Sequence, residues 1–133
     1  MTTTIAEQLS TVSLYERLGA SAGIRRIVDG MVDAHLENPV IRARFQPYLN
    51  DPERVEEIKR HICAFFEMRA GGPGPYRGRC MVEAHRGMNI AEAEYVAAVD
   101  DILGTMRALG HREEERAEVL AMLYGLKDEI IRV

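Results

Sequence analysis

The stretch that decides the fold is GGPGPYRGRCMVEAHRGMNI, which runs from Gly71 to Ile90. Its opening Gly71-Gly72-Pro73-Gly74-Pro75 cannot continue a helix, because glycine loses much backbone entropy there and each proline removes a donor and fixes φ. The helix before this stretch must therefore end near Ala70. The run from Arg79 to Met88 is compatible with a short helix whose largely apolar face carries Met81, Ala84, His85 and Met88. An imidazole in such surroundings makes His85 the leading candidate for a functional residue.

Capping signals mark two helices before this stretch. Ser13 with Glu16 three residues later forms a capping box, and Gly19 closes a very short helix. Ser21 can cap a second helix, which should end near Asn38-Pro39. Its apolar residues recur at helical spacing, namely Ile24, Ile27, Val28, Met31 and Val32.

Two further helices lead up to the glycine-rich stretch. Pro39 to Arg44 reads as one short helix. Asp51-Pro52-Glu53 is a strong helix start, with a capping oxygen, a proline at the first helical position and an acid favoured by the dipole. This helix should run from Pro52 to about Ala70, with one apolar stripe made of Val55, Ile58, Ile62 and Phe65.

Two helices follow the stretch. Asn89 with Glu92 predicts the start of one, which reaches Leu109-Gly110 with an inner face of Tyr95, Val99, Ile102, Leu103 and Met106. The last begins around Arg112 and buries Val119, Leu123, Leu126 and Ile130. With no strand alternation and no repeat, the sequence predicts an all-α fold: one domain over residues 13–133 after a flexible segment of residues 1–12.

Composition narrows the function classes. The chain has 133 residues, of which 47% are apolar, enough for one substantial core. Its net charge is −4 and its basic residues are dispersed, which argues against a nucleic-acid partner. No apolar run approaches the roughly 20 residues of a membrane span, and the polar start is not a secretory signal. We therefore expect a cytoplasmic protein, with reduced and inert thiols at Cys63 and Cys80.

Two other histidines lie on helices. His35 shares the apolar face of Met31. A hydrogen-bonded core histidine, or a cation near the C-terminal end of the helix dipole, is favoured over a ligand role. His61 lies at the edge of the apolar stripe of its helix, where the sequence alone favours a histidine that faces solvent.

The pattern G-G-P-x-x-Y-x-G-x-x-M-x-x-x-H is complete from Gly71 through Tyr76 and Met81 to His85, and it resembles that of the group I truncated haemoglobins. The similarity extends from Ser13–Gly19 to the last helix. It implies a truncated globin fold, a two-over-two helical sandwich around a haem. It also implies haem b as a non-covalent cofactor, with His85 as the proximal iron ligand. The absence of C-x-x-C-H agrees with non-covalent binding.

The resemblance supplies the rest of the site. Phe45 matches the phenylalanine that stacks on the haem. The other haem contacts that it implies are Ile58, His61, Ile62, Phe65, Tyr76, Met81, Ile90 and Tyr95. Lys59, Arg60, Arg77 and Arg79 are candidate partners for the haem propionates.

The departures from the family pattern concern the distal side. Group I members commonly carry a tyrosine and a glutamine that hydrogen-bond the bound gas, and this chain has Val32 and Ile62 at those places, with Ile58 also aliphatic. One such bond is worth about 1.5–3 kcal/mol, so its loss should speed release of O2 about 10- to 100-fold. His61 falls where bis-histidyl members place a sixth iron ligand. The resemblance therefore implies a six-coordinate resting state.

The resulting hypothesis is a haem-binding globin that reversibly binds O2, NO or CO, in the manner of oxygen-binding and oxygen-transport proteins. The alternatives are an electron-transfer or redox- or gas-sensing haem protein and an NO dioxygenase, the last of which is disfavoured by the missing donors. A haem-free helical interaction module is the least favoured. The expected partners are the gas and an unidentified reductase, and we expect a monomer or a weak dimer.

Overall fold

The computed structural model describes residues 12–76 and 78–133, so the expected flexible segment 1–12 lies outside the described residues except for Val12. The described part is helical, and the only β pairing in it is an isolated parallel bridge between Ile90 and Ile131. This confirms the all-α prediction. In chain order the elements are α2 (Leu14–Arg17), α3 (Ala20–Glu37), α4 (Arg42–Phe45), the 3-10 helix η1 (Gln46–Tyr48), α5 (Pro52–Arg69), α6 (Met81–His85), α7 (Glu92–Ala108), α8 (Glu113–Gly125) and α9 (Lys127–Ile130).

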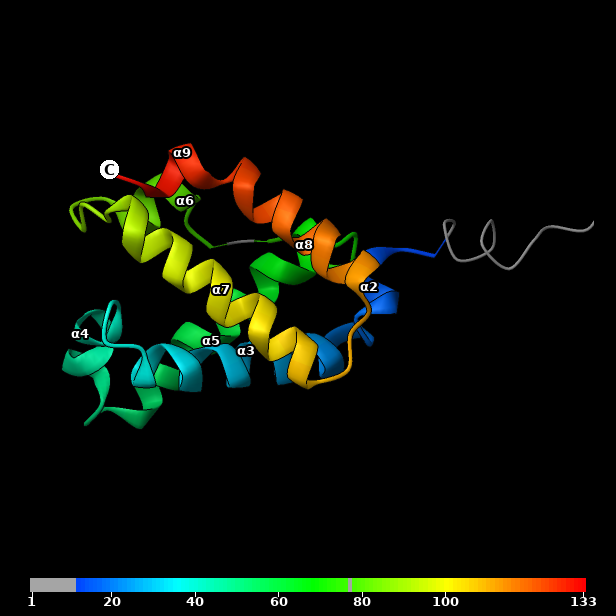
Figure 1. Ribbon diagram of the computed structural model, residues 1–133, viewed down its shortest axis with the longest axis horizontal. Helices are drawn as coiled ribbons and strands as arrows, with labels where there is room; N and C mark the ends of the chain where they lie inside the picture. The colour runs from blue at the N-terminus through cyan, green and yellow to red at the C-terminus, as the bar shows by residue number, and fades with distance from the viewer. Residues whose placement is uncertain (1–11, 77) are drawn as a thin grey trace, which may run out of the picture.

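The long helices form two layers. α3 packs against α5, and α7 packs against α8. α3 also contacts α7, which joins the two pairs into a two-over-two sandwich (Figure 1). The short α6 lies beside α9 at one end of the sandwich.

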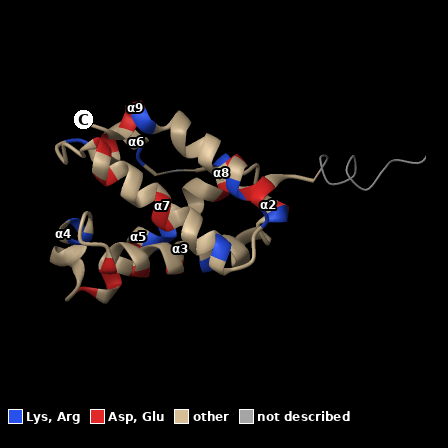
Figure 2. Cartoon of the chain, in the orientation of Figure 1, with Lys and Arg blue, Asp and Glu red and all other residues tan. Residues whose placement is uncertain are grey.

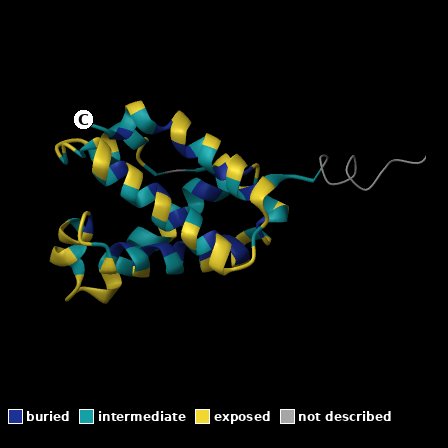
Figure 3. Ribbon diagram, viewed as in Figure 1, coloured by how far each residue is buried: buried dark blue, intermediate teal, exposed yellow. Residues whose placement is uncertain are grey.

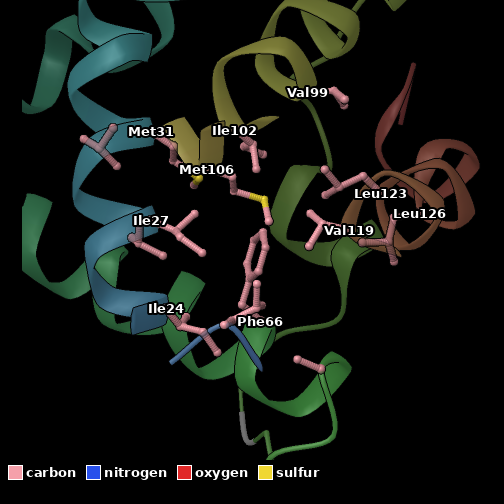
Figure 4. Close-up of a cluster of buried hydrophobic side chains, with 14 of the residues drawn as sticks. Ile24, Ile27, Met31, Phe66, Val99, Ile102, Met106, Val119, Leu123 and Leu126 are labelled. Atoms are coloured by element: carbon pink, nitrogen blue, oxygen red, sulfur yellow. The ribbon is translucent and has the colours of Figure 1, made fainter. Parts of the chain in front are cut away.

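The core fills the space between the layers, and the expected helix faces supply it. Ile24, Ile27 and Val28 of α3 are fully buried. Figure 4 shows Phe66 of α5 pointing toward Met106 of α7, with Val119, Leu123 and Leu126 closing the cluster from the C-terminal side. Burial of this apolar surface is the main force that holds the helices in place.

The start of α3 differs from the expectation. Ser13 accepts a hydrogen bond from the backbone N–H of Glu16, which confirms the first cap. Gly19, with φ +96°, turns the chain so that α3 begins directly at Ala20. This left-handed conformation favours glycine. Ser21 therefore lies inside α3, where its hydroxyl pairs with that of Tyr15 at 2.9 Å, and the prediction of a Ser21 cap is wrong.

The predicted helix from Pro39 to Arg44 is shifted along the chain. The side-chain oxygen of Asn38 accepts a hydrogen bond from the backbone N–H of Val40 at 3.0 Å, which holds the residues before Arg42 in a turn. α4 consequently spans Arg42–Phe45. The start of α5 is as predicted, because Asp51 caps it through the backbone N–H of Arg54 at 3.1 Å.

The helix that carries His85 is shorter than the run Arg79–Met88. α6 spans Met81–His85, because Cys80 is extended and Arg86 leaves the helical region with ψ 131°. The capping box predicted at Asn89 is also wrong. α7 starts at Glu92, and the carboxylate of Glu94 accepts a hydrogen bond from the backbone N–H of Ala91 at 3.1 Å.

The C-terminal helix is broken in two, since the chain turns at Leu126 between α8 and α9. The predicted inner residues Val119, Leu123, Leu126 and Ile130 are nevertheless buried. Among the helices of residues 12–76 and 78–133, none combines the length and apolar character that a membrane span requires. Acidic and basic side chains are intermixed along the helices (Figure 2).

Candidate haem site

His85 ends α6, and its imidazole is held by its own helix. Nδ1 lies 2.8 Å from the carbonyl oxygen of Met81, one turn earlier. Because a carbonyl can only accept, Nδ1 must carry the proton, which leaves the Nε2 lone pair as the basic atom of the neutral ring. This tautomer is the one a metal ligand needs, and histidine ligands are commonly oriented by such a bond.

The apolar residues predicted around His85 share a common degree of burial. Ile62 and Phe65 of α5, Met81 of α6 and Ile90 pack against the core while keeping exposed surface. Phe45 and Ile58 are likewise half-buried. In Figure 3 the fully buried positions concentrate along α3 and the inner faces of the long helices. A set of half-exposed apolar side chains from four segments is the kind of surface that an apolar ring would cover.

Tyr76 links the loop before α6 to α5. Its ring meets that of Phe65 edge to face, with centroids 5.4 Å apart, and its hydroxyl donates to the carbonyl of Arg79 at 2.8 Å. A Cβ on Gly78 would come within 2.3 Å of the Tyr76 hydroxyl, so a larger residue there would displace the Tyr76 ring. Burial raises the pKa of Tyr76, which keeps its hydroxyl protonated as a donor. The motif residues thus hold the loop that leads to His85.

Tyr95, another predicted haem contact, packs against α8. It is buried on α7, and its hydroxyl donates to the carbonyl of Leu123 in α8. Burial raises its pKa to about 12. Its ring also lines a groove of about 200 Å³ between α7 and α8, together with Val96, Val99, Asp100, Leu103, Leu120, Tyr124 and Lys127. The Tyr95 hydroxyl is therefore engaged within the protein.

The positions of the missing distal donors differ in burial. Val32 is 2% exposed and belongs to the core, whereas Ile58 and Ile62 are half-buried on α5. None of these three side chains can donate a hydrogen bond. An additional hollow along the start of α5 is lined mainly by charged side chains, among them Glu53, Glu56, Glu57 and Arg60, and does not suit an apolar ring.

His61 projects from α5 into solvent. Its side chain is 59% exposed, and its Nε2 atom lies 3.7 Å from the carboxylate of Glu57. This agrees with the interpretation from the sequence alone. Among the candidate propionate partners, Lys59 pairs with Asp29 of α3 at 3.1 Å, Arg60 and Arg79 are exposed, and Arg77 lies outside the described residues.

His35 is a hydrogen-bonded core histidine, as the sequence predicts. It is 5% exposed, and its Nδ1 lies 2.8 Å from Oδ2 of Asp101 on α7. Its ring stands 5.5 Å from that of Phe45, centroid to centroid. The sequence gives no sign of Asp101 as the partner, because the two residues are far apart in the chain and Asp101 looks like one more surface acid of α7.

Arg44 and Glu94 were not among the predicted site residues. The guanidinium of Arg44 forms two hydrogen bonds to the carboxylate of Glu94, at 2.7 and 2.9 Å, and a third to the carbonyl of Met88 at 2.7 Å. The only sequence signal available was that Arg44 directly precedes Phe45. The two cysteines are free, and burial raises the pKa of Cys63, which favours the unreactive thiol.

Fold and site together define a class of protein. A two-layer helical sandwich carries half-buried apolar side chains on α4, α5 and α6, together with a histidine whose Nδ1 lies 2.8 Å from the carbonyl oxygen of Met81. These residues fit a haem, which needs an axial nitrogen and apolar walls. The class is that of the haem-binding globins.

Comparison with known proteins agrees with this class. The family model described as bacterial-like globin matches residues 13–132. A group 1 truncated hemoglobin from Tetrahymena thermophila is 27% identical over 111 residues, which cover 81% of this chain and 88% of the relative. The group 1 truncated hemoglobin GlbN from Synechocystis sp. is 28% identical over 114 residues, 83% of this chain and 88% of that protein.

The fold is also found among solved structures. The Fe(III) form of the truncated hemoglobin from Tetrahymena pyriformis superposes with a TM-score of 0.82 at 21% identity, covering 92% of this chain and all of that one (100%). The chain therefore belongs to the bacterial-like globin family, and its fold is the two-over-two helical sandwich of the truncated hemoglobins.

Proposed function

We propose that the protein binds haem b non-covalently through Nε2 of His85 and, in the ferrous state, binds O2, CO and NO reversibly. The observation that carries the proposal is the 2.8 Å hydrogen bond from Nδ1 of His85 to the carbonyl of Met81, which fixes the metal-binding tautomer. When bound, ferrous haem would supply the iron that takes up a diatomic ligand. The half-exposed side chains of Phe45, Ile62 and Phe65 would cover its apolar faces.

The distal residues shape the expected ligand chemistry. Ile58 and Ile62 exclude water but donate no hydrogen bond, so they stabilise the partial negative charge of bound O2 poorly. CO is less polar and depends less on such a donor. We therefore expect fast O2 release, and we expect the missing donors to affect CO binding less than O2 binding.

Ligand kinetics test this proposal. Haem is added to the purified chain, the iron is reduced, and O2 release is measured by stopped flow and CO rebinding by flash photolysis. A ferrous protein whose Soret band shifts on addition of CO and whose O2 leaves rapidly supports the proposal. A haem-loaded protein whose ferrous spectrum does not respond to CO contradicts it.

We infer further that His61 binds the iron as a sixth ligand in the resting state. The inference is supported by the place of His61 on α5 and by its loose attachment. Within the described part of the chain its one polar contact is the 3.7 Å approach to Glu57. A side chain so lightly held can be redirected at small cost. Such a ligand would compete with gases and lower their apparent affinity.

A further inference from the structure

The loop between His85 and α7, residues 86–91, is held from two sides. On one side the C-terminal residues fix it: the backbone N–H groups of Gly87 and Asn89 donate to the carbonyl of Val133 at 3.2 and 3.3 Å. The N–H of Arg132 donates to the carbonyl of Ile90 at 2.9 Å. On the other side the side chains of Arg44 and Glu94 form hydrogen bonds to the loop.

Arg44 contacts this loop both directly and through Glu94. One guanidinium nitrogen donates to the carbonyl of Met88, and two others hold the carboxylate of Glu94 in a bidentate pair. The same carboxylate accepts the N–H of Ala91, at the end of the loop. The N–H of Met88 in turn donates to the carbonyl of His85 at 3.0 Å. A continuous chain of hydrogen bonds therefore runs from Arg44 to the backbone of the histidine.

Partial burial, opposite charge and bidentate geometry stabilise the ion pair between Arg44 and Glu94. Arg44 and Glu94 are 32% and 19% exposed, so water screens them only partly. The hydrogen bond to Arg44 lowers the pKa of Glu94, which keeps the carboxylate charged at neutral pH. A planar fork that meets a carboxylate and a carbonyl at once is a geometry that lysine cannot reproduce.

We propose that Arg44 is a positioning residue for the haem site: its fork to Glu94 and the Met88 carbonyl fixes the loop after His85 relative to Phe45. The inference rests on the proposed function of His85 as iron ligand. Phe45 follows Arg44 directly in α4, so one residue ties the aromatic side chain of the distal corner to the backbone of the proximal histidine. A displacement of Phe45 is then transmitted to the loop after His85, and a displacement of that loop is transmitted to Phe45.

The first test measures the loop itself in the full chain, by amide hydrogen exchange followed by NMR. Arg44→Gln removes the fork. The matched control is Arg25→Gln, which removes a bidentate pair to Glu56, at 2.7 and 2.7 Å, that joins α3 to α5 away from the loop. We expect the amides of residues 87–91 to exchange about 10-fold faster in Arg44→Gln, relative to amides inside α7, and unchanged in the control.

The second test is spectroscopic. The Fe–His stretching band is recorded by resonance Raman on the five-coordinate ferrous protein, formed directly or by photolysis of its CO complex. We expect a shifted or broadened band in Arg44→Gln and in Arg44→Lys, and the native band in Arg25→Gln. Arg44→Lys keeps the charge but loses the fork, so it also serves if the glutamine variant folds poorly.

Each outcome decides the proposal. Loop exchange that is unchanged, or that rises equally in the control, overturns it. Faster exchange with a native Fe–His band shows that Arg44 holds the loop without positioning the histidine, which also overturns it. A chain that binds no haem refutes the proposed function instead. The exchange experiment does not depend on haem, so it still shows whether Arg44 holds the loop.

Discussion

Nδ1 of His35 lies 2.8 Å from Oδ2 of Asp101, and this contact joins α3 to α7 beside Phe45. The side-chain amide of Asn38 donates to both oxygens of the same carboxylate at 3.2 Å. Asp101 is thus shared by two residues at the end of α3. A polar cluster of this kind, placed against the haem-stacking candidate Phe45, ties the distal corner to the core.

The His35 site predicts a dependence of stability on pH. Burial lowers the pKa of His35 from 6.5, and the Asp101 carboxylate opposes this only in part. The unfolded chain therefore binds more protons than the folded one just below pH 6.5, so the free energy of unfolding falls as the pH drops through this window. His35→Leu should flatten the profile, as measured by urea denaturation between pH 5 and pH 7.5.

His111 needs its own control in that experiment, because burial lowers its pKa as well. His111→Gln should remove only the contribution of His111 to the pH dependence of the free energy of unfolding. A His35→Leu protein with the same slope as the unmodified chain would contradict the assignment. The carboxylates with lowered pKa values, such as Glu94, take up protons in the unfolded chain around pH 4.5, so they add to the slope only at the acidic end of this range.

Ile62→Gln should restore one distal donor. Ile62 is half-buried on α5, so a polar amide is tolerated there better than a tyrosine at the fully packed Val32. One hydrogen bond to bound O2 should slow its release about 10- to 100-fold, measured by stopped flow. Ile62→Leu is the apolar control and should release O2 as fast as the unmodified protein. Equal rates in all three proteins would place Ile62 away from the gas.

His61→Ala tests the sixth ligand. If the imidazole binds the iron, the ferric spectrum of the haem-loaded protein is low-spin, and the substitution converts it to a high-spin form with water or no ligand. His111→Ala, on the loop before α8, is the control and should leave the spectrum unaltered. A His61→Ala spectrum identical to that of the unmodified protein would exclude His61 from the coordination sphere.

Phe66→Ala tests the core between the layers. Phe66 is 4% exposed and packs in the cluster that includes Met106, so its truncation should cost about 3–5 kcal/mol of unfolding free energy. Tyr124→Ala, at a side chain that is 61% exposed, should change stability by no more than about 0.5 kcal/mol. Denaturant unfolding monitored by circular dichroism compares the two. Similar losses would contradict the packing described for Phe66.

The sequence predicts the features that depend on local signals. The Ser13 cap and the start of α5 at Pro52 both follow from residues within one helical turn of each other. The Ser21 and Asn89 caps fail because local propensity is overridden, by the left-handed turn at Gly19 in one case and by the carboxylate of Glu94 in the other. Periodicity identifies the core faces, since packing depends on them directly.

The features that the sequence could not predict depend on pairing between distant residues. Arg44 and Glu94 are 50 positions apart, and neither has a local pattern that marks the other. The same holds for His35 and Asp101, which are 66 positions apart. Only the folded chain shows that His35 packs against the haem-stacking candidate Phe45 and that Arg44 and Glu94 bond to the loop after His85.

The most direct test of the account is a haem titration of the unmodified chain and of His85→Gly, followed by absorption spectroscopy. We predict one haem per chain with a sharp Soret band, loss of that band in His85→Gly, and its recovery when imidazole is added to the variant. A His85→Gly protein that binds haem with the native spectrum and without imidazole would show that His85 is not the proximal ligand.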